Sequence, residues 1–154
     1  GGQRMTETTA TTRVDRVELF DALAAAMGAD PERYERLGDI EMDLVIRMRR
    51  AGGPDFLVSL GFHGITCDHV TTVEPGAERA ADCWLDGDLA AWEGMFENIA
   101  AHGHAVDEWT LNTLTLFGER ISLHAADPMG EDRFHRFNQT LQEFVDAAAR
   151  IGPA

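Results

Sequence analysis

Residues 40 to 49 alternate between apolar and polar side chains, and this period of two constrains the fold more than any other feature. Successive side chains of a β-strand point to opposite faces of a sheet, so the run predicts a strand with one buried and one wet face. A turn at Ala51-Gly52-Gly53-Pro54 follows, and a second alternating run predicts a hairpin partner. The expected inward-facing residues are Ile40, Met42, Leu44, Ile46 and Met48, then Phe56, Val58, Leu60 and Phe62.

Three further strands complete the predicted sheet. Residues 65 to 74 are rich in Thr and Val, and with the hairpin they predict a three-stranded antiparallel meander. Residues 80 to 85 predict a short fourth strand. Residues 120 to 125 alternate again and predict a fifth, with Ile121 and Leu123 facing inward.

Three- and four-residue spacing of apolar side chains predicts helices elsewhere. The first helix is expected over residues 14 to 28, and Asp30-Pro31 is a start signal for a short helical turn that ends near Leu37. A cap at Asp86 or Asp88 predicts the next helix.

The C-terminal third is expected to contain two more helices. Residues 106 to 117 fit neither period cleanly, and we interpret them as helical. One continuous final helix is expected from Asp127-Pro128 to a stop at Gly152-Pro153. The element order predicts an α+β fold: a mainly antiparallel or mixed sheet of about five strands with helices packed on one face.

Length and composition suit a single core, because 44% of the 154 residues are hydrophobic. Met5 is preceded by Gly-Gly-Gln-Arg, so we interpret residues 1 to 4 as an expression remnant and residues 5 to 12 as a polar, disordered lead-in. A single domain is expected over residues 13 to 152.

Charge restricts the classes of partner. The chain has 27 acidic residues against 13 basic ones and a net charge of −14, which disfavours nucleic acid and anionic lipid surfaces. No apolar run is long enough to span a membrane and no signal peptide is recognisable, so a cytoplasmic protein is expected. The two cysteines, Cys67 and Cys83, are expected to be free, buried thiols.

Two stretches of the sequence have distinctive patterns. Residues 80 to 85, followed by Asp88-Leu89, form an Ala-Asp-led strand that runs into a helix with an early Asp-Leu, and residues 116 to 123 combine an aromatic residue, a glycine, a basic residue and an alternating strand. Both stretches resemble the sterol carrier protein 2 (SCP2-like) family. The likeness covers about residues 14 to 151, although His124-Ala125-Ala126-Asp127 replaces the Gly-Asp usual after the last strand.

The resemblance implies a cavity between the sheet and the helices that holds an apolar or amphipathic molecule, such as a sterol, fatty acid or acyl thioester, without covalent chemistry. Delivery of this ligand to an enzyme of lipid or polyketide metabolism is one hypothesis. No catalytic residue, cofactor or metal is predicted. The nine residues expected to line the cavity are Trp84, Trp92, Met95, Phe96, Trp109, Leu114, Phe117, Phe134 and Phe137. The alternative interpretation is that these side chains simply fill the core.

Several polar groups admit a functional and a structural interpretation. His102 and His104 with Asp107 could bind a metal, or the histidines could form a polar helix end. Cys67 with His69 could form a nucleophile pair, although the alternation of a strand would point Asp68 away from the imidazole. The basic cluster Arg47, Arg49 and Arg50 could bind a carboxylate or a phosphate, or pair with neighbouring acids.

Two other functional classes remain open at this point. The phrase Gly87-Asp88-Leu89-Ala90-Ala91-Trp92 is similar to one in the nuclear transport factor 2 (SnoaL-like) class. That class implies a cyclase, isomerase or hydrolase, with His102, His104, Asp107 or Asp82 as candidate acid and base residues. The third hypothesis is a structural homodimer joined by an exposed aromatic patch.

Overall fold

The computed structural model describes residues 13 to 151. The expected lead-in of residues 1 to 12 and the helix stop at Gly152-Pro153 lie outside the described residues. None of the helices between residues 13 and 151 combines the length and the apolar character needed to cross a membrane.

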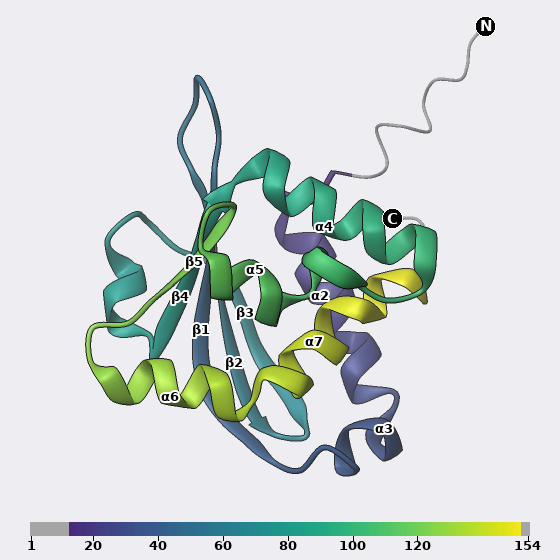
Figure 1. Cartoon of the computed structure of the whole chain (residues 1–154). Coiled ribbons are helices and arrows are strands. Elements are labelled where there is room, and N and C mark those ends of the chain that lie inside the picture. Colours follow the sequence, from purple (N-terminus) through teal and green to yellow (C-terminus); the bar gives the residue numbers. More distant parts are fainter. Residues whose placement is uncertain (1–12, 152–154) are drawn as a thin grey trace, which may run out of the picture.

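A five-stranded mixed sheet forms the framework of the molecule, with the spatial order β3-β2-β1-β4-β5 (Figure 1). β2 pairs antiparallel with both β1 and β3, β4 runs parallel to β1, and β5 is antiparallel to β4. The predicted meander and the predicted fifth strand are therefore confirmed. The strands are β1 (Ile40–Arg49), β2 (Phe56–Gly64), β3 (Thr66–Thr72), β4 (Cys83–Asp88) and β5 (Ile121–His124).

The two faces of the sheet follow the alternation of β1. Its even-numbered residues are buried, and Leu44 lies between Leu60 of β2 and Cys83 of β4. The odd-numbered residues are turned to the opposite, outer face, where Val45 is the buried exception. The inner face is therefore the one against which helices must pack.

The helices lie against that inner face, as predicted; Figure 1 shows α2, α4, α5 and α7 on the same side of the sheet. The segment 106 to 117 is indeed helical, divided by Thr110 into a 3₁₀ turn and a short α-helix. The helices are α2 (Val17–Gly28), α3 (Pro31–Glu35), α4 (Leu89–His102), α5 (Leu111–Phe117), α6 (Pro128–Arg136) and α7 (Asn138–Asp146), with 3₁₀ turns η2 (Ala77–Ala80), η3 (Asp107–Trp109) and η4 (Ala147–Ala149).

Several predicted boundaries differ from the structure: the first helix begins at Val17 and not at residue 14, and two other boundaries were wrong for a structural reason. The fourth strand begins at Cys83 because the preceding residues form η2, whose Glu78 carboxylate accepts a hydrogen bond from the Gly76 amide at 2.7 Å. The expected single final helix is broken at Phe137, whose backbone leaves helical geometry at φ −103° and ψ 15°. The break lets α6 lie against β4 while α7 turns over the core.

Gly130 shows how closely α6 approaches the sheet. A Cβ atom at this position would lie 1.9 Å from the Asp82 carbonyl oxygen, just before β4. Because no side chain fits there, glycine allows α6 to lie directly against the backbone that precedes β4.

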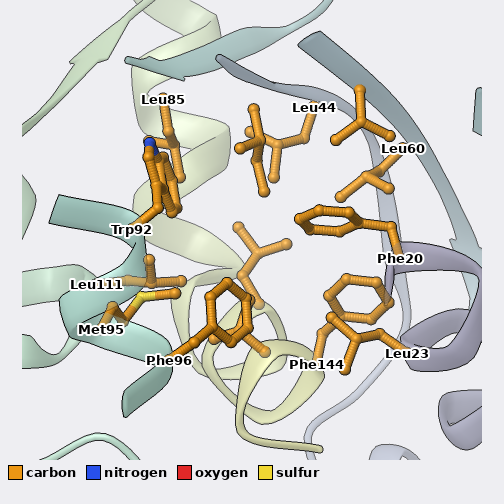
Figure 2. Close-up of a cluster of buried hydrophobic side chains, with 14 of the residues drawn as sticks. Phe20, Leu23, Leu44, Leu60, Leu85, Trp92, Met95, Phe96, Leu111 and Phe144 are labelled. Atoms are coloured by element: carbon orange, nitrogen blue, oxygen red, sulfur yellow. The ribbon is translucent and has the colours of Figure 1, made fainter. Parts of the chain in front are cut away.

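The core between the sheet and the helices is filled with apolar side chains (Figure 2). Phe144 of α7 meets Phe62 of β2 edge to face, with ring centroids 5.0 Å apart. Phe20 of α2 stacks on Phe56 and meets Phe96 of α4 edge to face, each at 6.4 Å. These contacts tie α2 and α7 to the rest of the core.

Candidate ligand-binding site

A pocket of about 140 Å³ opens at the surface where η3, α5 and the start of β5 meet. One wall is apolar and comes from α5, whereas two carboxylates and a guanidinium stand around it. A small concave site with apolar walls and a few polar groups is the usual form of a small-molecule site. The lining residues are Glu108, Thr113, Leu114, Phe117, Glu119 and Arg120.

The rim of this pocket exposes unusually large apolar side chains. Leu116 is 74% exposed and Phe117 is 70% exposed, and both belong to the last turn of α5. Leu111 and Leu114 of the same helix are buried. The helix therefore presents apolar surface both to the core and to the outside, next to a pocket.

Trp109 of η3 contacts Arg120, one of the residues that line the pocket. Its ring lies so close to α4 that a Cβ atom on Gly94 would be 2.5 Å from Cη2 of the indole. The Arg120 guanidinium lies over the ring, 4.5 Å from its centroid, which is a cation–π contact. Asp107 begins η3 with a left-handed backbone, φ 55°, which Asp tolerates better than most residues.

The N-terminal end of α5 is held by two polar side chains of α7. The Leu111 amide donates to Oε1 of Gln142 at 2.8 Å, and the Ala105 amide donates to Oδ1 of Asp146 at 3.0 Å. Gln142 Nε2 also donates to Oδ1 of Asp146, at 2.9 Å. One face of α7 thus holds both ends of the segment from residue 105 to residue 111.

Asp146 is buried, and burial raises the pKa of its carboxyl group. The hydrogen bonds from Ala105 and Gln142 oppose this shift, and the negative charge of Glu143 adds to it. The carboxylate has no ion-pair partner among residues 13 to 151. Asp146 therefore acts through hydrogen bonds to the backbone that leads into α5.

We expect Gly94→Ala to displace the Trp109 ring, because the new methyl group would overlap the indole. Helix propensity favours alanine by about 1 kcal/mol, so the overall change in stability should be small. The indole N–H resonance of Trp109 should shift in an NMR spectrum, while that of the buried Trp92 should not. Gly28→Ala, where nothing lies within 4 Å of the new methyl group, is the control. An unmoved Trp109 resonance would contradict the contact.

Comparison with solved structures identifies the fold of this chain. No protein-family model matches the chain, and no curated protein matches its sequence. A crystal structure of sterol carrier protein 2 superposes with a TM-score of 0.69 at 17% identity, over 90% of this chain and 99% of that one. The chain has the sterol carrier protein 2 fold.

Two other solved structures are more distantly similar. A conserved hypothetical protein from Thermus thermophilus, described as a possible sterol carrier protein, has a TM-score of 0.49 at 20% identity, over 100% of this chain and 94% of that one. Sterol carrier protein 2 from Yarrowia lipolytica, in its apo form, has a TM-score of 0.45 at 11% identity, over 86% and 90% of the two chains. Assignment of the SCP2 fold depends on the first superposition alone.

Within this fold, three of the nine predicted ligand-binding residues gather at the pocket. Leu114 and Phe117 line it, and Trp109 supports the guanidinium that stands beside it. The sequence had suggested all three from their apolar character.

Four other predicted residues are core residues in this structure. Trp92, Met95 and Phe134 are 0% exposed, so they touch no space wide enough for water, and Phe96 is also buried. Trp92 Nε1 additionally donates to the Arg47 carbonyl oxygen at 3.2 Å. The filled-core alternative therefore describes these four side chains as the structure shows them.

The last two predicted residues lie away from the pocket. Trp84 sits on the outer face of the sheet, since it pairs with Val45 and its ring stacks on His124 at 5.6 Å. It therefore cannot share a cavity with Trp92, which packs on the inner face. Phe137 is half-buried at the break between α6 and α7, with the Arg136 guanidinium 5.9 Å from its centroid.

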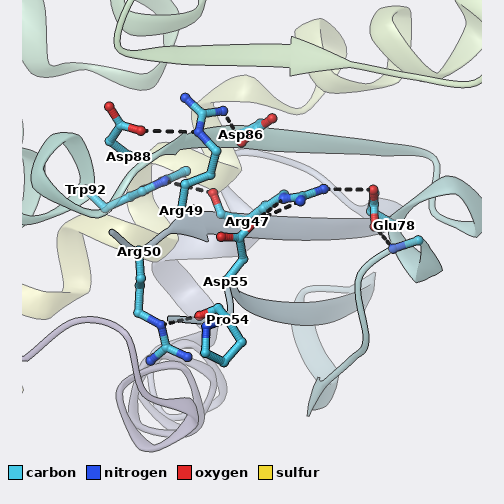
Figure 3. Close-up of polar contacts among 10 residues, drawn as sticks. Arg47, Arg49, Arg50, Pro54, Asp55, Glu78, Asp86, Asp88 and Trp92 are labelled. Carbon is cyan, nitrogen blue, oxygen red and sulfur yellow. Dashed lines mark hydrogen bonds and ion pairs between the residues drawn. The ribbon is translucent and has the colours of Figure 1, made fainter. Parts of the chain in front are cut away.

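The basic cluster on the outer face is neutralised internally (Figure 3). Arg47 pairs with Asp55 at 2.7 Å and with Glu78 at 3.2 Å. Arg49 pairs with Asp86 at 2.6 Å and with Asp88 at 3.2 Å.

Arg50 is satisfied as well: it donates to the Pro54 carbonyl oxygen at 2.7 Å and pairs with Asp15 at 3.1 Å. The three arginines therefore follow the structural interpretation of the sequence, and they offer no unpaired cation for a phosphate.

The histidine and cysteine hypotheses find little support in the geometry. His102 and His104 are exposed, and their Nδ1 atoms lie against the carbonyl oxygens of Asn98 and Ala105 at 3.3 and 3.1 Å. In the part of the chain that the structure describes, no three His, Cys, Asp or Glu side chains come together to hold a metal.

Both cysteines are buried, free thiols, as the composition predicts. Burial raises the pKa of Cys67 to about 11 and that of Cys83 to about 12, so neither is activated as a nucleophile. The Cys67 thiol contacts the backbone carbonyl oxygen of His69 at 3.6 Å, not its imidazole. Asp82, a candidate acid, accepts a hydrogen bond from the Asp43 amide at 2.7 Å.

Sequence reasoning missed four of the six residues that line the pocket: Glu108, Thr113, Glu119 and Arg120. They are polar residues that flank or face an apolar helix, and no local motif marks them. The one available signal was the loop position of Glu119 and Arg120 next to Phe117, since ligand-binding groups concentrate on loops beside a rigid scaffold.

Proposed function

We propose that this protein binds an apolar or amphipathic small molecule without covalent chemistry, as a carrier of a sterol, a fatty acid, an acyl thioester or a similar lipid. The apolar rim and wall that α5 gives to the pocket carry this proposal, because exposed apolar surface beside a concave site is typical of ligand entry. The SCP2 fold supports it, since the superposed structure is that of a protein named as a sterol carrier.

The size of the pocket limits how the ligand sits. About 140 Å³ is close to the roughly 150 Å³ of an engineered apolar cavity that holds one benzene molecule. A ring or a short alkyl segment therefore fits as the structure stands. A longer tail would have to pass between α5 and the sheet, which requires α5 to move.

α5 is the element that would have to move. It has only seven residues, and it is held by its packing on β5 and η3, by two buried leucines and by the hydrogen bonds that α7 makes to residues 105 and 111. Each buried ligand methylene contributes about 0.8 kcal/mol, so a ten-carbon tail could supply roughly 8 kcal/mol. Association costs would leave micromolar-class binding, which suits a carrier that must release its cargo.

We expect Phe117→Asp to weaken binding of a neutral fluorescent lipid probe by at least about tenfold, because it replaces the apolar rim with a charge. Phe117 is 70% exposed, so the folded state should tolerate the change. Met129→Asp is the matched control: Met129 is 68% exposed on α6 and does not line the pocket. Equal affinities of the two variants would remove the pocket from the proposal.

Native mass spectrometry of the protein purified from cells, followed by organic extraction, would test the carrier role directly. A co-purified lipid is expected. Its absence, together with failure to bind any fluorescent lipid probe, would contradict the proposed function. The cytoplasmic location, a homodimer and a partner enzyme stay predictions, and the two free cysteines suit a reducing compartment.

A further inference from the structure

The pocket carries more negative than positive charge. Two carboxylates, Glu108 and Glu119, and one guanidinium, Arg120, stand around it, which leaves one net negative charge. All three side chains are exposed, and none forms an ion pair with another described residue. The two carboxylates therefore have no internal partner to satisfy them, unlike the acids that pair with Arg47 and Arg49.

The Arg120 guanidinium already has an interaction partner beside the pocket. The guanidinium lies 4.5 Å from the centroid of the Trp109 ring, and the six-membered part of that ring also lies close to Gly94. This contact shows that an aromatic face beside the pocket accepts a cation. Phe117, which lines the pocket and is 70% exposed, offers a second aromatic face with no cation on it among the described contacts.

The charge of the whole molecule has the same sign as the pocket. At a net charge of −14 the protein repels anions and attracts cations. The Debye length is about 8 Å at physiological ionic strength, so charges farther from the pocket are largely screened there and the field of the whole molecule acts mainly at lower salt. A carboxylate head would meet repulsion from the local pair and from the molecule as a whole.

We infer that the pocket selects amphiphiles whose head group is a protonated amine. The ammonium lies between the carboxylates of Glu108 and Glu119, and the adjoining apolar part rests on Leu114 and Phe117. This inference depends on the proposed function, because it names the class of ligand for the same site. It predicts a preference for amine over carboxylate head groups, which neither the apolar walls nor the fold alone would produce.

The test compares three ligands with one ten-carbon chain and different heads: decylamine, decanol and decanoate. Each displaces a neutral fluorescent probe at neutral pH and below its micelle concentration. Decylamine should bind about tenfold more tightly than decanoate, with decanol between them, and the ratio should shrink as salt is added.

Two double variants separate the pocket from the overall charge. Glu108→Gln with Glu119→Gln should abolish most of the preference. The Glu32→Gln, Glu35→Gln variant also removes two negative charges, but from exposed positions on α3. This variant should retain most of the preference for decylamine.

Decanoate binding as tightly as decylamine would overturn the inference, and so would an equal loss of preference in the two double variants. If decanol still bound in either of these cases, the proposed function would stand. If none of the three ligands bound, the proposed function would fail, and this inference would fail with it.

Discussion

Trp92→Ala should lower the free energy of unfolding by about 3–5 kcal/mol, the range for removing a large aromatic side chain from a packed core. Trp92 of α4 lies beside Leu85 of β4 and is 0% exposed (Figure 2). Its indole N–H also satisfies the Arg47 carbonyl oxygen, so the substitution removes a hydrogen bond along with the packing.

Chemical denaturation of matched variants would measure this effect. Trp92→Phe should cost about 1–2 kcal/mol, because most of the ring stays but the donor to Arg47 is lost. Trp84→Ala is the control, since Trp84 is only half-buried on the outer face, and its cost should be clearly smaller. If Trp92→Ala cost less than about 1.5 kcal/mol, the ring would be lining an unfilled cavity instead of filling a core.

The stability change of Trp92→Ala also indicates how a ligand enters the protein. If Trp92, Met95 and Phe134 fill the space behind the pocket, no preformed tunnel runs through the core beside them. A ligand tail must then displace α5 and its two buried leucines. The cost of that displacement reduces the affinity below what the buried methylenes alone would give.

Local periodicity was enough to predict most of the framework. The alternation of residues 40 to 49 requires a strand, and its inner face is the one the structure buries. The same alternation does not say which face of a short strand is inner when both carry apolar residues. In β4, Trp84 and Leu85 are both apolar and lie on opposite faces of the strand. The parallel pairing with β1 turns Leu85 toward the core.

Contacts between distant segments were beyond the reach of periodicity. The amphipathic pattern continues smoothly through Phe137, but α6 ends there, and its start is fixed by the close approach of Gly130 to Asp82. The seating of Trp109 on Gly94 likewise joins residues of two different elements. Such contacts decide the shape of the pocket, and the pattern of a single segment cannot predict them.

The second large effect concerns the buried carboxylate that holds the segment before α5. We expect Asp146→Ala to lower the free energy of unfolding by about 2–4 kcal/mol, because it leaves two donors, the Ala105 amide and the Gln142 side chain, without their acceptor. Asp146→Asn keeps an oxygen that can accept both hydrogen bonds, so it should cost much less. Denaturation at neutral pH would compare the two variants.

The pH dependence of Asp146→Asn gives a sharper test, because the sign follows from burial. Burial raises the pKa of Asp146 in the folded state above its unfolded value of about 3.9, while nearby His104 opposes the shift and Glu143 adds to it. Between those two pKa values the folded state holds a proton that the unfolded state has lost, so the native protein loses stability as pH rises through this window. Asparagine cannot titrate, and its stability relative to the native protein should therefore increase from acidic to neutral pH and then level off. A constant difference across that range would show that the carboxyl group has an ordinary pKa and is not desolvated beneath the segment that leads into α5.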